Sequence, residues 1–290
     1  MSGRRAYLPL AIAISALAVV LWLGRGLDPG WRLIAAAGCG YVLFKSAAVV
    51  GPQRAEFLAL TGRARIFFSL PWPGFDAKRF TKRGGDMPTR DRLAGGALRM
   101  TAGGLAVVLA SLNHESWGDA ASWVGIGGIL LLVHLGYAYV LTWLAQRAGY
   151  PVRPLFDDPW KSGSLGEFWT ERWNAPFVEM DRILFLPPLR WWLKPRVAAF
   201  GVFLISGVLH EMAISYPAGS GFGLPMAYFG IHATAVYAER TVLKLKTWPV
   251  AAARTWTIAL VFLPLPLLFH HAFRTQLVFP LLQAIAEVLR

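Results

Sequence analysis

The chain has 290 residues, of which 56% are hydrophobic, and its mean hydropathy is +0.46. Soluble domains are roughly 45–50% apolar, so this composition excludes an ordinary water-soluble protein and indicates a polytopic membrane protein. The net charge of +13 would suggest nucleic-acid binding in a soluble protein. Here the basic residues separate apolar runs and predict loops facing an anionic leaflet, so we expect membrane lipids and no nucleic acid as partners.

Four apolar runs in the first half of the chain predict membrane spans: Tyr7–Leu23, Trp31–Val50, Leu93–Leu112 and Ala121–Ala145. The first run follows two arginines and is not followed by a small-residue cleavage site, which favours a retained helix over a signal peptide. Cys39 in the second run is the single cysteine, which excludes an intrachain disulfide and a multi-cysteine metal site. We expect no metal.

Between the second and third runs lies a long basic segment, Gly51–Arg92. Its apolar part, Ala55–Leu70, is interrupted by Arg63 and Arg65, which predicts a helix lying on the membrane surface. The sequence Trp72-Pro73-Gly74-Phe75-Asp76 follows and predicts a rigid turn anchored at the interface.

The second half contains further apolar runs: Val197–Tyr216, Phe222–Leu243, Trp256–His271 and the shorter Thr275–Leu289, which could be an eighth span. We therefore expect an all-α polytopic bundle of about eight transmembrane helices with interfacial amphipathic helices. A single membrane-embedded domain over residues 1–290 is predicted.

The distribution of Lys and Arg predicts the topology. Gly51–Arg92, Gln146–Arg196 and Arg240–Arg254 are basic, whereas the loops after the third and fifth runs contain no Lys or Arg. The basic loops and the N-terminus should be cytoplasmic, and we expect the membrane to be a bacterial cytoplasmic membrane.

The segment Ser164–Asn174 is polar, aromatic and charged at once. Ser164 and Glu167 have the spacing of a capping box, which predicts the start of a helix. Aromatic and apolar residues then recur at helical spacing and give one face suited to the cytoplasmic interface: Leu165, Phe168, Trp169 and Trp173. The helix should end at Asn174, as a C-terminal cap, because Pro176 prevents an undistorted continuation.

Inside the run Val197–Tyr216 lie His210 and Glu211. An ionisable pair within a span suggests a functional site, although a core histidine bonded to a neighbouring helix is the alternative. Ser206 is one helical turn earlier on the same face, but no acid is placed to complete a hydrolase triad. A general base acting on a substrate hydroxyl needs less machinery. For His134, in an earlier run, we expect a buried hydrogen-bonded role.

Two motifs together resemble the membrane-bound O-acyltransferases, in particular their wax-synthase-like branch. The first is Phe168-Trp169-Thr170-Glu171-Arg172-Trp173-Asn174, and the second, some 35 residues later, is Ser206-Gly207-Val208-Leu209-His210-Glu211. The turn at Trp72 and the segment from Ala227-Tyr228-Phe229-Gly230 to Glu239-Arg240 are also similar. The resemblance covers roughly residues 67–240.

This resemblance implies a bundle of membrane helices around a tunnel and transfer of an acyl group from a coenzyme A thioester to a hydroxyl, with acyl-CoA as co-substrate and no bound cofactor. It implies that His210 is the catalytic histidine and Asn174 its partner. We expect the remaining motif residues to bind substrate: Phe168, Trp169, Arg172, Trp173, Ser206 and Glu211. Arg172 would hold the coenzyme A phosphates. The chain is short for the family, and Phe75 stands where the family turn has methionine.

The acceptor is expected to be a long-chain or lipid alcohol. An acyltransferase of the same family acting on a polysaccharide or small metabolite is one alternative. A proton-coupled transporter using His210 and Glu211 as a relay is another, but the paired broken helices of inverted repeats are missing from the sequence. A non-catalytic membrane scaffold would leave His210 without an explanation.

Overall fold

The structure, a computed structural model, describes residues 3–82, 84 and 90–290, except for the side chains of Arg90 and Lys246. Within these residues the fold is helical and has no strand, which confirms the all-α prediction. Seven of the described helical segments are long and apolar enough to cross a membrane: Arg5–Gly24, Pro29–Val50, Asp91–Leu112, Asp119–Arg147, Pro195–Ala218, Val250–Leu268 and His271–Leu289. The chain is an integral membrane protein.

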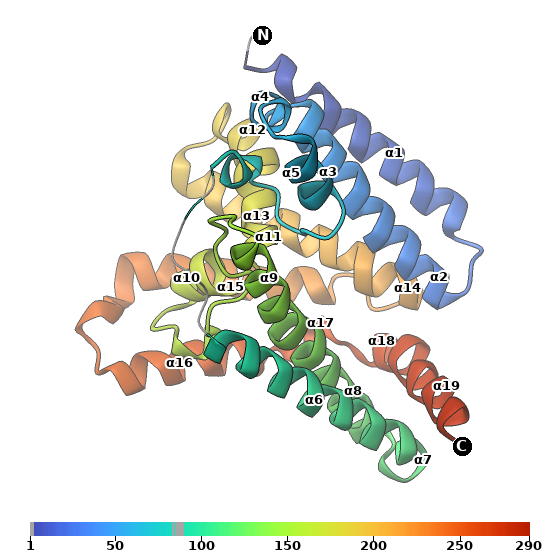
Figure 1. The fold of residues 1–290 in the computed structure, drawn as a ribbon. Coiled ribbons are helices and arrows are strands. Elements are labelled where there is room, and N and C mark those ends of the chain that lie inside the picture. The colour runs from blue at the N-terminus through green and yellow to red at the C-terminus, as the bar shows by residue number, and fades with distance from the viewer. Residues whose placement is uncertain (1–2, 83, 85–89) are drawn as a thin grey trace.

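The N-terminal helices form a hairpin at one side of the molecule (Figure 1). α1 (Leu8–Gly24) packs against α3 (Gly40–Val50), and α2 (Pro29–Leu33) joins them. Leu17 lies within 3.5 Å of the position of a Cβ on Gly40, so the two helices approach closely there. The adjoining core contains Leu10, Leu17 and Phe44.

A second pair of helices is packed through glycines. α6 (Arg90–Leu112) crosses the long segment that contains α8 (Asp119–Ile129) and α9 (Ala138–Arg147), and α7 (His114–Trp117) connects them. A Cβ on Gly103 would lie 2.5 Å from the Leu132 nitrogen, so only glycine fits this crossing. This is the small-residue packing that the sequence predicts for the third run.

α13 (Pro195–His210) and α15 (Leu224–Ala238) are the next closely packed pair, joined through α14 (Tyr216–Ala218). α15 continues as a wide helical turn over Glu239–Leu243 and is not among the seven candidate spans. The remaining helices are α16 (Val250–Phe262), α17 (Leu265–Leu268), α18 (His271–Phe273) and α19 (Phe279–Leu289). The seventh run thus begins six residues earlier than predicted.

The predicted surface helix over Ala55–Leu70 is two short helices, α4 (Arg54–Leu58) and α5 (Gly62–Ser69). Thr61 separates them because its hydroxyl accepts a hydrogen bond from the Ala64 N–H (3.3 Å), which starts α5. Phe68 is fully buried, and Trp72 in the following turn is only 2% exposed. The turn is therefore part of the core, which corrects the prediction of an interfacial anchor.

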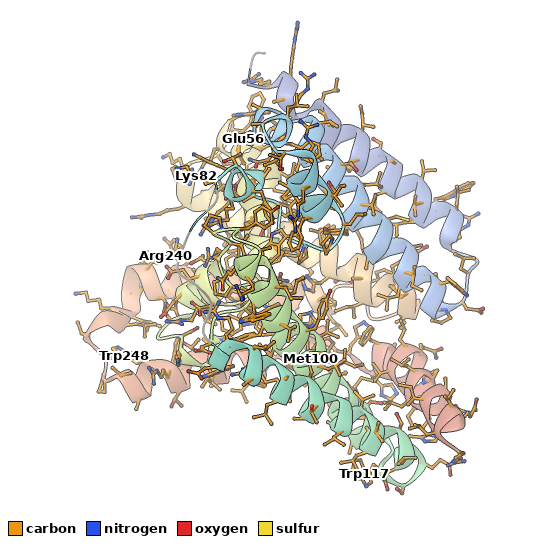
Figure 2. All side chains as sticks on the ribbon, viewed as in Figure 1. Glu56, Lys82, Met100, Trp117, Arg240 and Trp248 are labelled. Atoms are coloured by element: carbon orange, nitrogen blue, oxygen red, sulfur yellow. The ribbon has the colours of Figure 1, made fainter. Side chains whose placement is uncertain are left out.

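Three short helices occupy the middle of the fold: α10 (Leu165–Glu167), α11 (Ala175–Met180) and α12 (Leu186–Arg190). α10 and α11 lie near α9, α13 and α15 (Figure 1). Side chains fill the space between the ribbons, with Lys82 and Arg240 toward one side and Trp117 at the far end (Figure 2). The structure thus brings the first motif, from Phe168 to Asn174, inside the bundle.

Candidate active site

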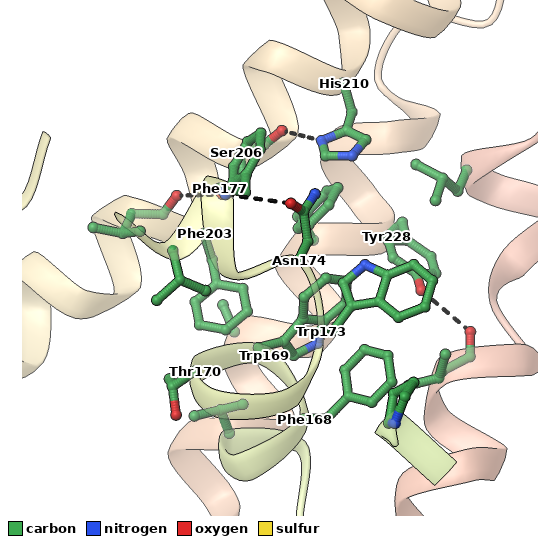
Figure 3. Close-up of a pocket in the computed structure, with 18 of the residues that line it drawn as sticks. Phe168, Trp169, Thr170, Trp173, Asn174, Phe177, Phe203, Ser206, His210 and Tyr228 are labelled. Carbon is green, nitrogen blue, oxygen red and sulfur yellow. Dashed lines mark hydrogen bonds between the residues drawn. The ribbon is translucent and has the colours of Figure 1, made fainter. Parts of the chain in front are cut away.

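A cavity of about 790 Å³ lies between the two motifs. Its walls come from α11, α13, α15, α16 and the turn that precedes α11, and they are mostly aromatic and aliphatic (Figure 3). The lining also includes Ile126, Leu130, Phe269, Phe273 and Val278. Such a volume and lining are typical of a site for a largely apolar ligand.

His210 lies on the cavity wall at the end of α13, with its orientation fixed by its own helix. Nδ1 lies 2.7 Å from the Ser206 carbonyl oxygen, which can only accept a hydrogen bond, so Nδ1 carries the proton. In the neutral ring Nε2 is then the basic nitrogen. The rings of Phe177 and Phe229 pack against the imidazole with centroid distances of 5.7 and 4.4 Å. This arrangement suits a neutral histidine that accepts a proton at Nε2.

Asn174 begins α11 rather than ending the preceding helix. Its Oδ1 accepts a hydrogen bond from the Phe177 N–H (3.3 Å), and its backbone has a φ of 49°. Asparagine tolerates this left-handed conformation better than most residues, and Pro176 is accommodated in the first turn of the new helix. The predicted C-terminal cap is therefore wrong. Because Oδ1 is used by the cap, the Asn174 NH₂ group is the part left for a ligand, and it faces His210 across the cavity (Figure 3).

The aromatic residues of the first motif line the same cavity. Phe168, Trp169 and Trp173 are all part of its wall. The Trp173 ring stacks between Phe168 and His134, with interplanar angles of 12° and 4°. These side chains form a rigid apolar surface inside the bundle, whereas the sequence predicted a face lying in the membrane interface.

A hydroxyl and a carboxylate hold the start of this motif in position. Ser164 Oγ accepts from the Glu167 N–H at 3.0 Å, as the predicted capping box requires. The buried Glu239, from the end of α15, accepts hydrogen bonds from the N–H groups of Leu165 (2.8 Å) and Gly166 (3.0 Å). It also accepts one from the Trp256 indole at 3.0 Å. Three elements therefore fix the start of α10.

Three predicted site residues have partners that occupy their side chains. Arg172 donates to Glu167 (2.5 Å) and to the Asp157 carbonyl (3.1 Å), and it does not line the cavity. The hydrogen bond to the Glu167 carboxylate raises the pKa of the Arg172 guanidinium and outweighs the lowering by burial. Glu211 also lies outside the lining and accepts from the Gly223 and Met226 N–H groups, which caps α15. Ser206 lines the cavity, but its hydroxyl donates to the Val202 carbonyl at 3.0 Å.

Other lining residues were not predicted as part of the site. Arg182, Arg196 and Arg240 are exposed and line the cavity together. Arg196 precedes His210 by 14 residues on one helix, which is close to four full turns, so helical spacing could have identified it. His134 also lines the cavity, and its buried Nδ1 has no hydrogen-bond partner among the described residues, contrary to the expected bonded role.

The cavity residues coincide with widened helical turns. His134, Trp169 and Asp181 lie on π-helical turns, and another begins directly after His210. Single π-turns within α-helices are frequent at functional sites because they re-aim side chains that a regular helix would direct elsewhere.

Comparison with known proteins agrees with the two motifs. Residues 152–231 match the model of the membrane bound O-acyl transferase family, a stretch that includes both Asn174 and His210. The match supports the resemblance to the membrane-bound O-acyltransferases and covers 80 of the 290 residues. The family motifs thus come from segments that converge on one cavity.

Curated proteins similar to this chain include plant acyltransferases. The chain is 31% identical over 127 residues to the probable long-chain-alcohol O-fatty-acyltransferase 6 of Arabidopsis thaliana, an alignment that covers 39% of this chain and 37% of the relative. It is 30% identical over 100 residues to the Arabidopsis acyl-CoA–sterol O-acyltransferase 1 (30% and 29% covered). It is 32% identical over 85 residues to the Arabidopsis diacylglycerol O-acyltransferase 1 (28% and 16% covered). The alignments span less than half of these relatives.

Proposed function

We propose that the protein transfers an acyl group from acyl-CoA to the hydroxyl of a long-chain or lipid alcohol. The observation that carries the proposal is the pairing of His210, with Nδ1 bonded to the Ser206 carbonyl, and Asn174 across one apolar cavity. The names of the relatives support the class of acceptor, since they act on long-chain alcohols, sterols and diacylglycerol. Acyl-CoA is a co-substrate, and we propose no bound cofactor.

In the proposed reaction, His210 Nε2 takes the proton from the acceptor hydroxyl as its oxygen attacks the thioester carbonyl. The Asn174 NH₂ group donates to the oxyanion that forms. The carbon–sulfur bond then breaks, and the proton on Nε2 passes to the departing thiolate. The products are an ester and free coenzyme A, and no protein nucleophile is needed.

The long acyl-CoA donor enters this cavity at its basic mouth, the part lined by the exposed Arg182, Arg196 and Arg240. Arg196 is roughly 21 Å from His210 along α13, at about 1.5 Å per residue. Arg240 lies eleven residues beyond Phe229, on the wide turn that continues α15, and the short connection between α13 and α15 brings it to the same end. Coenzyme A has phosphates at one end and the thioester at the other, so its phosphates at these arginines would bring the thioester toward His210.

The walls of the cavity favour a lipid acceptor over a polysaccharide. Tyr237, Ile258 and Phe262 line the cavity and are also 54%, 42% and 62% exposed on the outside of the bundle. An apolar acceptor in the bilayer could enter between α15 and α16. A polysaccharide would require many polar partners in the wall, and the lining is mostly apolar.

The decisive experiment is transfer from radiolabelled acyl-CoA in membranes that contain the protein. Long-chain alcohols, a sterol, diacylglycerol and a soluble sugar are compared as acceptors. We expect labelled ester with one or more of the lipid alcohols and none with the sugar. Labelled sugar alone, or no transfer to any acceptor while the protein is folded, would refute the proposal.

The basic mouth gives a prediction of its own. Arg196→Gln and Arg240→Gln should each raise the KM for acyl-CoA by about 5- to 30-fold. A hydrogen bond to a charged group contributes about 1.5–3 kcal/mol, and it contributes less at an exposed site where water competes for the same groups. The kcat should change little, since the arginines are remote from His210. Arg190→Gln is the control, because Arg190 is exposed nearby but does not line the cavity. Equal KM values in all three variants would remove the mouth from the donor site.

The location of the chain within a cell follows from the same proposal. The basic loops and the N-terminus face the cytoplasm, and the protein binds acyl-CoA from that side. The relatives named above come from a plant, so the expected bacterial cytoplasmic membrane has no support from them.

A further inference from the structure

One carboxyl group in the cavity wall has no role in the reaction above. Asp181 lines the cavity and is only 9% exposed. Its Oδ1 is fully buried and has no hydrogen-bond partner among the described residues. Burial raises the pKa of the Asp181 carboxyl well above its ordinary value, which favours the protonated, uncharged form. A polar group of this kind without a partner costs stability, which suggests that a ligand supplies the partner.

The position of Asp181 on its helix is informative. Asn174, Phe177, Val178 and Asp181 all line the cavity, and this spacing puts them on one face of the helical segment that starts at Asn174. Asp181 is seven residues beyond Asn174, which is roughly 10 Å along the axis. The adjoining lining residues Arg182 and Arg196 belong to the mouth. Asp181 therefore lies on the wall between the reacting centre and the arginines.

The donor has polar groups at the corresponding distance. Between its thioester and its phosphates, acyl-CoA carries the pantetheine arm, which has two amides and a hydroxyl. The outer amide nitrogen is seven bonds from the sulfur, and this is roughly 8 Å in an extended chain at the reach of about 1.1–1.2 Å per bond that a backbone has. An uncharged carboxyl can both donate and accept a hydrogen bond, as an amide can. The two groups are complementary in chemistry and in position.

We propose that Asp181 is a donor-binding residue that hydrogen-bonds the outer part of the pantetheine arm, at its outer amide or the adjacent hydroxyl. The inference rests on the proposed function, because it requires that the thioester reach His210 from the basic mouth. Asp181 would then recognise the coenzyme A part of the donor and make no contact with the reacting thioester carbonyl. The residue thus selects thioesters of a full pantetheine arm over shorter ones.

The test compares two donors in three variants. Acyl-CoA contains the whole arm, whereas acyl-N-acetylcysteamine keeps the thioester and the inner amide and ends before the outer one. Asp181→Leu should raise the KM for acyl-CoA about tenfold, the loss of one hydrogen bond of about 1.4 kcal/mol, and leave the KM for the short thioester unchanged. Asp181→Asn should behave nearly as wild type, because an amide also donates and accepts. Glu171→Gln is the control, since Glu171 is exposed in the same region and does not line the cavity.

Stability without substrate provides a second measurement. A merely structural carboxyl predicts a lower Tm for Asp181→Leu, whereas our inference predicts an equal or higher Tm, because leucine of similar size removes an unpartnered polar group. Coenzyme A should raise the Tm of the wild type more than that of Asp181→Leu. Equal KM changes for both donors, an unchanged KM in Asp181→Leu, or equal Tm shifts would overturn the inference. If the wild type transfers from neither thioester and coenzyme A leaves its Tm unchanged, the proposed function itself fails.

Discussion

Three histidines in the helical bundle differ in what their ring nitrogens can do. The His210 Nδ1 is bonded to its own helix, and Nε2 is on the ring edge that faces the cavity. His232 is fully buried, with Nδ1 bonded to the Tyr228 carbonyl (2.9 Å) and Nε2 without a partner among the described residues. His134 is stacked on Trp173 and also lines the cavity. This geometry favours His210 as the proposed base, the same residue that the motif resemblance implies.

His210→Ala should lower kcat by about 10²–10⁴-fold, the usual contribution of a general base, while the Tm in detergent changes by only a few degrees. His232→Ala should do the opposite and lower the Tm, because it opens a void in a fully packed site. His134→Ala, on the cavity wall, should mainly alter KM. Similar losses in the three variants, or near-normal transfer by His210→Ala, would eliminate His210 as the base.

Asn174 combines a structural and a proposed chemical role, and two substitutions separate them. Asn174→Asp keeps an oxygen to cap α11 but loses the NH₂ donor, so transfer should fall by about 10²–10³-fold at nearly unchanged Tm. Asn174→Gly keeps the left-handed backbone but lacks both groups, and it should lose activity and a few tenths of a kcal/mol of stability. If Asn174→Asp retains near-normal transfer, Asn174 is only a helix cap.

At the scale of elements, the turn at Trp72–Asp76 is held by the buried Lys45 and the half-buried Glu179. The Lys45 ammonium, from α3, donates to the carbonyls of Trp72 (3.3 Å) and Gly74 and lies 3.6 Å from the Phe68 ring centroid. On the other side, Glu179 accepts from the N–H groups of Phe75 (2.8 Å) and Asp76. Burial raises the pKa of the Glu179 carboxyl. The turn thereby ties α3 to α11, which carries Asn174 at its start.

Lys45→Met should destabilise the protein, because the Gly74 carbonyl loses its donor at a cost of about 1–3 kcal/mol, whereas the Trp72 carbonyl keeps the Tyr41 hydroxyl at 3.2 Å. The change should appear as a lower Tm, and activity should fall only near that temperature. Lys78→Met, just after the turn, is the matched control, because Lys78 is exposed and its substitution should leave the Tm unchanged. A Tm for Lys45→Met that equals the wild type would mean that water or backbone movement satisfies the Gly74 carbonyl.

For the whole molecule, the sequence predicted what depends on local pattern. Apolar runs predicted the helical bundle. The two motifs predicted that Asn174 and His210 lie close together, and both line one cavity. Long-range packing explains the rest. Trp72 looked interfacial because an aromatic beside proline is usual at a membrane surface, yet Lys45 and Phe80 enclose it. Arg172 was chosen for its place in the motif, but Glu167 already binds it, and the arginines that line the mouth come from three separate segments.

The last prediction concerns orientation in the membrane. Glu56, Lys82 and Arg240, which belong to the basic loops, lie toward one side of the molecule, and Trp117 lies at the far end (Figure 2). In a variant with the exposed Cys39 replaced by alanine, single cysteines at Lys82, Lys161 and Thr247 should resist an impermeant thiol reagent added outside intact cells. Cysteines at Glu115 and Ser220, in the loops without Lys or Arg, are the positive controls and should be labelled. Labelling of the first three and protection of the controls would invert the topology. It would then put the arginine mouth on the side away from cytoplasmic acyl-CoA, which the proposed donor does not allow.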